Sequence, residues 1–293
     1  MMNPTDSSDR ALQAEPAAVV AQPSYYSRFS LGQRYLHGVI MATFIGLALT
    51  GMVLRFSHSG WADGLALAVG GFSAILFWHK FCAVIMTIAF LIHLGDVGYR
   101  GIFKGQHGIL WGPNSMVPRL KDIQDLYGHF RWFLWLGPRP EFDRYAYWEK
   151  FDYWAVFWGM GIIGISGYAM WFAPFFARVI PGSWLNIALL IHGEEALLAV
   201  WFIFAIHFFN THLRPGSFPM DLVIFTGRMT EEELKEKHPA EYHRLVETGR
   251  LQAFLAPAPQ RWLKNFGRVV GTVVVLSGFV LLVLTLFTYF RGS

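Results

Sequence analysis

Five stretches of this chain are apolar over about 20 residues or more, the length at which a helix crosses the hydrocarbon core of a membrane. Charged residues make up only 15% of the 293 residues, whereas soluble domains carry about a quarter. A shorter, glycine-rich apolar stretch at 61–71 is expected to form an interfacial turn or short helix. We therefore predict an all-α integral membrane helical bundle with spans at 35–56, 72–97, 152–174, 184–209 and 268–290.

Lysine and arginine are distributed unequally between the two sides of the predicted bundle. The N-terminal segment holds three, the loop between the second and third spans holds eight, and the loop between the fourth and fifth spans holds nine. The opposite side holds only Arg55, Lys80, Arg178 and Arg291. Because cytoplasmic loops carry the excess of positive charge, we expect a cytoplasmic N-terminus and an external C-terminus. As a separate expectation we assign the chain to a bacterial inner membrane, so that the external side is the periplasm.

The segments outside the spans differ in composition. The first two dozen residues are polar and rich in alanine and proline, without the apolar core of a signal peptide. The aromatic segment GHFRWFLWLGPRP (128–140) is expected to lie along the membrane interface. These features predict a disordered cytoplasmic tail at 1–24, a four-helix domain at 25–215, a cytoplasmic helical loop at 216–265 and a C-terminal transmembrane helix at 266–293.

The loop before the last span contains a signal for a soluble helix. Thr230 precedes a turn rich in glutamate, which is the pattern of a capped helix start. His238 and His243 follow this turn and are expected to be solvated surface residues.

Five histidines lie within the predicted spans, at two depths. Because successive spans alternate in direction, His79 and His192 fall in an outer layer, and His37, His93 and His207 fall in a cytoplasmic layer. The fourteen residues from His79 to His93 leave a net rotation of about −40°, and the fifteen from His192 to His207 leave about +60°. Each pair therefore shares a helix face, and its members lie about 21–22 Å apart along the axis.

Facing imidazoles at two depths are the pattern expected for two stacked haems. A haem is a large apolar disc whose iron takes axial nitrogen ligands, and a four-helix bundle can enclose it. Two histidines per iron leave no open coordination position, which favours electron transfer. The single cysteine, Cys82, excludes within this chain a cysteine-ligated cluster or a c-type haem. A haem-free transporter or scaffold with a histidine–glutamate proton relay is the alternative, since membrane histidines also hydrogen-bond between helices.

The third predicted span lacks histidine but contains regularly spaced glycines. Gly161, Gly164 and Gly167 recur at intervals of three residues. Small residues at this spacing allow either the close approach of a porphyrin or close packing of helices.

Four motifs together resemble the b-type cytochrome subunits of respiratory formate dehydrogenases and nickel–iron hydrogenases, over about 25–215. They are RYLHGVIMATFIGLALTG, WHKFCAVIM, the block RYAYWEKFDYWAVFWG with GISGYAMWFAP, and the paired histidines of the fourth span. The resemblance implies a di-haem, quinone-coupled electron-transfer subunit of a respiratory oxidoreductase complex. It also implies an outer haem b on His79 and His192 and an inner haem b on His37 and His207.

His93 departs from that family's pattern. It is similar instead to the cytochrome b of quinol–cytochrome c reductases, where the second and fourth spans hold both haems. His207 therefore has two candidate partners, His37 and His93, and the unused histidine is expected to lie beside the haem or the quinone.

Several charged and polar residues are candidates for contacts with the cofactors. Arg34 and Lys80 adjoin ligand histidines and are expected to pair with haem propionates, unless they only extend to the membrane interface. Glu195 lies about 60° from His192 around the helix, whereas Glu194 lies about 160° away. The candidates for quinone or proton contacts are Glu195, Glu149 and His212.

The expected partner subunit follows from the redox motifs that this sequence does not contain. It has no iron–sulfur, pyranopterin or c-type haem motif, and no basic, base-stacking pattern typical of nucleic-acid binding. We therefore expect a c-type cytochrome or an iron–sulfur protein as partner subunit, with quinone as the substrate and the lipid bilayer as the surroundings.

Overall fold

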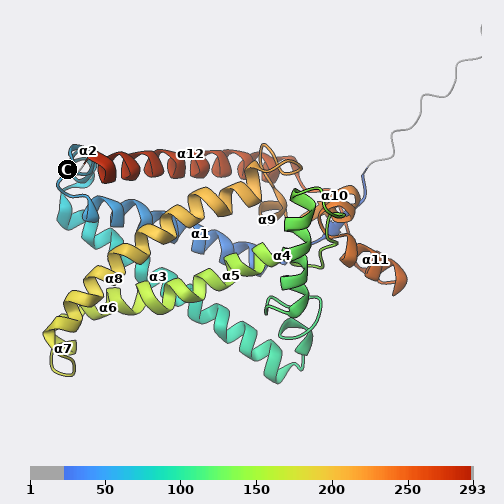
Figure 1. Ribbon diagram of the computed structural model, residues 1–293, viewed down its shortest axis with the longest axis horizontal. Helices are drawn as coiled ribbons and strands as arrows, with labels where there is room; N and C mark the ends of the chain where they lie inside the picture. The colour runs from blue at the N-terminus through green and yellow to red at the C-terminus, as the bar shows by residue number, and fades with distance from the viewer. Residues whose placement is uncertain (1–22, 292–293) are drawn as a thin grey trace, which may run out of the picture.

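Four long helices are the main elements of the computed structural model, which describes residues 23–291 (Figure 1). Of the predicted tail at 1–24, only Pro23 and Ser24 fall within the described residues. Figure 1 shows the long helices side by side, with the two described chain ends at opposite ends of the bundle. The helices are α1 (Leu31–Arg55), α3 (Phe72–Gly98), α8 (Gly182–Trp201) and α12 (Arg261–Arg291).

Among residues 23–291, four helical stretches are long and apolar enough to cross a membrane, which supports the predicted transmembrane character. Two of them are α1 and α12. The other two run on from α3 and α8 through π-helical turns and cover Phe72–Phe103 and Gly182–Leu213. These turns are η1 (Tyr99–Phe103), η4 (Phe202–His207) and η5 (Phe209–Leu213).

The predicted span at 152–174 is helical but is not one of these four. It consists of α5 (Tyr147–Gly159), the π-helical turn η3 (Met160–Gly164) and α6 (Ile165–Trp171). Its tyrosines, tryptophans and glycines give it a lower mean hydropathy than the other four. It nevertheless packs along α8 inside the bundle (Figure 1).

The stretch at 61–71 forms the expected short helix, α2 (Gly60–Val69). It ends at Gly70, whose φ of +108° is a backbone conformation that favours glycine. Trp61 Nε1 donates a hydrogen bond of 2.8 Å to Thr288 Oγ1 of α12, so α2 covers the bundle end where the C-terminus lies. Two other short elements are η2 (His107–Ile109) and α7 (Ala173–Phe176).

The core of the bundle lies where α1 meets α2, α3, η4 and α12. Small side chains such as Ala48, Ala62 and Ala66 are buried there among larger apolar ones. Gly278 of α12 allows a close contact, because a Cβ on it would lie 2.5 Å from Cδ1 of Phe204. The other buried members of this core are Met52, Val53, Phe56, Ile75, Val200, Phe208 and Leu281.

The structure is mostly helical, as predicted, and contains in addition one small three-stranded sheet. The strand β1 (Tyr25–Ser27) lies between β2 (Arg228–Thr230) and β3 (Leu255–Ala256), antiparallel to both. The sheet thus joins the start of the described chain to the loop before the last helix. Four short helices complete this loop: α9 (Val223–Thr226), α10 (Glu231–Lys237), α11 (Pro239–Glu247) and η6 (Leu251–Phe254).

The capped soluble helix predicted at Thr230 is confirmed as α10. The Thr230 side chain accepts a hydrogen bond of 3.2 Å from the Glu233 backbone N–H, and the Glu233 carboxylate accepts one of 2.8 Å from the Thr230 N–H. This reciprocal pair satisfies two backbone donors that the first turn of a helix leaves free.

A buried ion cluster fastens β1 to this loop. The Glu241 carboxylate accepts hydrogen bonds from Arg28 Nη1 at 2.6 Å and from Arg144 Nη1 at 2.8 Å. The side chains of Arg28 and Glu241 are each only 3% exposed. One carboxylate therefore holds together three segments that are far apart in the sequence.

The prediction that His238 is a solvated surface residue is wrong, whereas His243 is exposed as expected. His238 lies inside the ion cluster, where its Nδ1 donates to the Asp143 carbonyl at 2.8 Å and its Nε2 faces Arg28 Nη2 at 3.2 Å. Burial, and next the charge of Arg28, hold the pKa of His238 well below its ordinary value of 6.5. Pairing of β1 with the loop, rather than the pattern of α11, accounts for its burial.

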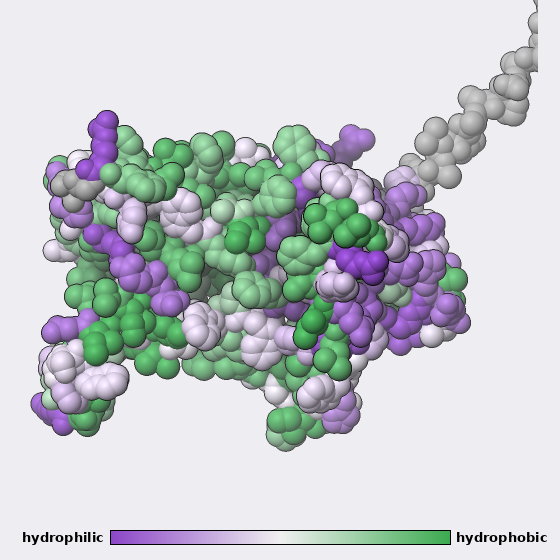
Figure 2. Space-filling model, in the orientation of Figure 1, coloured by the Kyte–Doolittle hydropathy of each residue, from purple (hydrophilic) through white to green (hydrophobic). Residues whose placement is uncertain are grey.

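The surface divides into an apolar body and a polar end. Figure 2 shows hydrophobic residues over the long helices and hydrophilic residues gathered at the end that carries α10 and α11. Exposed apolar side chains on α12 include Leu276, Phe279 and Val283. A continuous apolar surface of this extent is expected to face lipid rather than water.

The helix α4 (Leu120–Phe133) runs across the ends of the long helices (Figure 1). Its apolar residues Ile123 and Phe130 are exposed, and Trp135, just beyond it, is 92% exposed. An amphipathic helix in the membrane interface has this crosswise orientation. The interfacial location of 128–140 stays a prediction.

Candidate functional site

A cavity of about 2430 Å³ runs through the interior of the bundle, between α1, α3, α5 and α8. Ligand pockets in proteins commonly measure about 300–1,000 Å³, so this space exceeds what one small ligand requires. The five histidines of the predicted spans all line it: His37, His79, His93, His192 and His207. Both predicted histidine layers thus open into one interior space.

At the outer level, His79 and His192 face each other with ring centroids 6.2 Å apart. Metal–imidazole bonds are about 2 Å long, so two imidazoles on one metal ion would place their ring centroids about 6 Å apart. The observed separation fits a metal ion between the two rings.

Hydrogen bonds set the tautomers of both outer rings. The Nδ1 of His192 donates to the Ile163 carbonyl at 2.9 Å. The Nδ1 of His79 lies 2.9 Å from Thr50 Oγ1, and the Thr50 hydroxyl itself donates to the Gly46 carbonyl at 2.6 Å. Each Nδ1 therefore carries the proton and each Nε2 keeps a lone pair. Ligand histidines in metal sites commonly use their second nitrogen in this way.

Two glycines lie against the outer rings. A Cβ at Gly167 would lie 2.9 Å from His192 Cε1, and one at Gly51 would lie 3.2 Å from His79 Cε1. Both glycines therefore make room for an imidazole. Of the other glycines noted in the third predicted span, Gly161 has no atom within 4 Å of such a Cβ, and Gly164 has only Met160 Cε at 3.7 Å.

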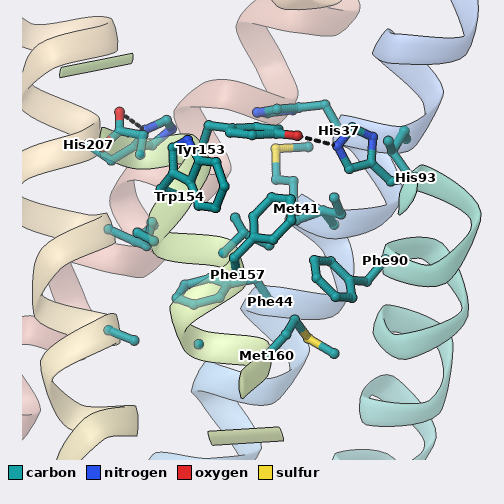
Figure 3. A pocket seen from close by; sticks show the side chains of 18 of the residues that line it. His37, Met41, Phe44, Phe90, His93, Tyr153, Trp154, Phe157, Met160 and His207 are labelled. Atoms are coloured by element: carbon teal, nitrogen blue, oxygen red, sulfur yellow. Dashed lines mark hydrogen bonds and ion pairs between the residues drawn. The ribbon is translucent and has the colours of Figure 1, made fainter. Parts of the chain in front are cut away.

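At the inner level, His207 and His93 have different partners. His207 Nδ1 donates to the Asp152 carboxylate at 2.9 Å, which leaves its Nε2 with a lone pair. His93 Nε2 instead lies 2.9 Å from the Tyr153 hydroxyl. No hydrogen bond from the described residues reaches either ring nitrogen of His37. Figure 3 shows His207 on one side of this space and His37 and His93 on the other.

The cationic candidates occupy different environments. Lys80 lines the cavity with its Nζ 5.0 Å from the centre of the Trp171 ring. Arg34 is not among the described residues that line the cavity, and its Nε donates to the Phe225 carbonyl at 2.9 Å. Arg55 lines the outer part of the cavity and pairs with Glu194 at 2.8 Å, and its buried Nε has no hydrogen-bond partner within residues 23–291. Lys80 and Arg55 are therefore better placed for an anionic group than Arg34.

Three further predicted residues line the cavity: Glu195, Glu149 and His212. Glu195 accepts a hydrogen bond of 3.2 Å from Trp158 Nε1. Glu149 accepts one of 2.7 Å from the Ala146 N–H and so caps the start of α5. His212 has a buried Nδ1 without a partner among the described residues.

The partners of the histidines were missed by reasoning from the sequence. Asp152 carried a signal, since a carboxylate within an apolar span marks a functional position. Tyr153 and Thr50 carried none, because hydroxyl groups in membrane helices commonly bond to their own backbone. The acceptor for His192 is a backbone carbonyl, which side-chain patterns do not reveal.

The donor set of the cavity fits bis-imidazole ligation of a flat, largely apolar cofactor. His79, His192 and His207 keep a lone pair on Nε2, and the buried Arg55 Nε offers a donor to an anion. Comparison with known proteins gives no further guide to the ligand, because no family model and no curated protein matches the chain.

Proposed function

We propose that the chain is a membrane di-haem cytochrome b subunit that passes electrons between a redox partner subunit on the outer side and quinone. The observation that carries this proposal is the outer histidine pair. His79 and His192 face each other at 6.2 Å across the cavity, and each presents an Nε2 lone pair. A b haem held by two imidazoles exchanges single electrons without an open coordination position.

The chain's own residues orient the proposed ligands. Thr50 and the Ile163 carbonyl hold the outer rings through Nδ1, and Asp152 holds His207 in the same way. We assign His37 as the partner of His207, because the Nε2 of His93 is engaged by Tyr153. Lys80 and Arg55 offer positive charge to propionates at the outer level.

Quinone chemistry is assigned to the inner level. His93 and Tyr153 form a polar pair between aromatic side chains of α3 and α5 (Figure 3). His212 and Glu149 line the same end of the cavity. These groups can donate hydrogen bonds to quinone oxygens or exchange protons with them. The source or acceptor of the electrons on the outer side is expected to be a c-type cytochrome or an iron–sulfur protein.

A reduced-minus-oxidised spectrum with haem quantification tests the proposal. The purified wild type is expected to carry two b haems, and His192→Ala, His207→Ala and His37→Ala one each. His93→Ala is the matched comparison and is expected to keep two.

Two results would count against these assignments. A wild type without haem would favour the haem-free transporter or scaffold. Loss of one haem from His93→Ala, with two kept in His37→Ala, would make His93 the inner ligand.

A further inference from the structure

The two proposed ligands on the α8 stretch differ in what their Nδ1 atoms bind. His192 donates to a neutral acceptor, the Ile163 carbonyl, whereas His207 donates to a carboxylate, that of Asp152. Both distances are 2.9 Å. The two sites thus share one ligand geometry and differ by one negative charge.

Asp152 has no role in capping or in the ion pairs of its neighbours. Glu149 caps α5, and Lys150 pairs with Asp122 at 2.8 Å. The Asp152 side chain is 13% exposed, and its ion pair among the described residues is with His207 alone. A carboxylate in an apolar span costs free energy. A functional role at the proposed ligand His207 would explain why Asp152 lies there.

A carboxylate acceptor changes the imidazole that it binds. It draws the Nδ1 proton toward itself and makes Nε2 a stronger electron donor. It also places a negative charge near the metal, where the low dielectric of the interior strengthens the interaction. Both effects stabilise the oxidised, more positive form of a haem iron relative to the reduced form.

We propose that Asp152 is a positioning residue that fixes the orientation of His207 and lowers the reduction potential of the inner haem. This inference rests on the proposed function, because it presupposes a haem on His207. The outer haem lacks such a charge on its ligands, since Thr50 and the Ile163 carbonyl are neutral. The carboxylate therefore favours electrons on the outer haem over the inner one.

A redox titration of the haem absorption bands in Asp152→Asn tests this. Asparagine keeps the size and the acceptor oxygen but removes the charge. Two haems are expected to remain, with one midpoint potential raised and the other unchanged. Repeating the substitution in His192→Ala, which is expected to retain only the inner haem, identifies which potential has moved.

Asp96→Asn is the matched control. Asp96, near the C-terminal end of α3, also borders the cavity, but it is exposed and pairs with Arg100 at 3.3 Å. Its substitution therefore removes the same charge without altering the hydrogen bond to His207. Neither potential is expected to change in this variant.

The outcomes separate the two proposals. Two haems with unchanged potentials in Asp152→Asn would overturn the inference and leave the proposed function standing, whereas a haem-free wild type would overturn the proposed function. If Asp152→Asn loses the inner haem, its recovery in Asp152→Glu supports the orienting role, and failure to recover refutes it.

Discussion

Gly167 of α6 and Gly51 of α1 lie directly against the imidazoles of the outer pair. A methyl group at Gly167 would lie 2.9 Å from His192 Cε1, closer than two carbons approach without a shift. The His192 ring is also held by the Ile163 carbonyl on the same helical stretch. It can therefore yield only by giving up that hydrogen bond or by tilting its Nε2 away from His79.

We predict that Gly167→Ala weakens binding of the proposed outer haem by roughly 5- to 150-fold, because overpacking costs about 1–3 kcal/mol. Haem titration of haem-depleted protein measures the loss. Gly161→Ala is the control, since a Cβ there has no neighbour within 4 Å. Equal haem affinity in the two variants would contradict the role assigned to Gly167.

At the scale of residues, a sequence pattern predicts which face of a helix a side chain occupies but not which residue it contacts. The spacing of the histidines gives the face of each helix, and all five line one cavity. The rotation of a neighbouring helix is not encoded in that spacing, so Asp152 was visible as an acid but not as the partner of His207. The tautomers depend on such partners and required the structure.

At the scale of elements, the sequence predicted local features correctly but did not reveal the pairing of segments that are distant along the chain. The start of α10 follows from Thr230 and Glu233, which are close in sequence. The strand β1 has only three residues, too few to show an alternating pattern, and its partners β2 and β3 lie some two hundred residues further along the chain. The burial of His238 depends on that pairing, which is why it was predicted as a surface residue.

Irregular turns within the helices also escaped prediction. Ile163 lies in the π-helical turn η3, and His207 ends the π-helical turn η4. Such turns are rare and recur at functional sites. They shift the direction of the following residues, and a regular 3.6-residue period cannot anticipate them.

His238 makes the segment that joins β1 to α11 sensitive to acid. Its folded-state pKa is depressed, so between that pKa and about 6.5 the unfolded state binds a proton that the folded state does not. The contribution to stability is therefore present above pH 6.5 and is lost as the pH falls below it, by at most about 1.4 kcal/mol per pH unit. Arg28, Arg144 and Lys237 add positive charge around the ring and oppose protonation.

We expect the protection of β1 and α11 amides against deuterium exchange, measured relative to their intrinsic rates, to decrease as the pH falls from 7 to 5. His238→Gln should reduce this dependence, because glutamine does not titrate. His243→Gln is the control, since His243 is exposed on the same helix and should leave the pH profile unchanged. An unchanged pH profile of amide protection in His238→Gln would show that another group causes the pH dependence.

At the scale of the whole molecule, the size of the cavity restricts what the bundle can be. The space of about 2430 Å³ is open in part to the surroundings and exceeds the roughly 300–1,000 Å³ of common ligand pockets. The bundle therefore has room for more than one cofactor-sized group. Composition predicted a membrane bundle. The cavity depends on the distances between the helices, which composition does not determine.

The orientation of the bundle in the membrane is the last property to test. Figure 1 places the turn that precedes α2 and the loop around α11 at opposite ends of the bundle. Ser57 in the turn and Arg250 in the loop are both exposed. The positive charges are concentrated at the loop end, so this end should be cytoplasmic.

Because Cys82 is the only cysteine, Cys82→Ala provides a background for single cysteines. We predict that a membrane-impermeant maleimide labels Ser57→Cys on intact spheroplasts and labels Arg250→Cys only after permeabilisation. The reverse pattern would invert the orientation and place the outer histidine pair on the cytoplasmic side. Labelling of both on intact spheroplasts would contradict the placement of these two segments on opposite sides of a membrane.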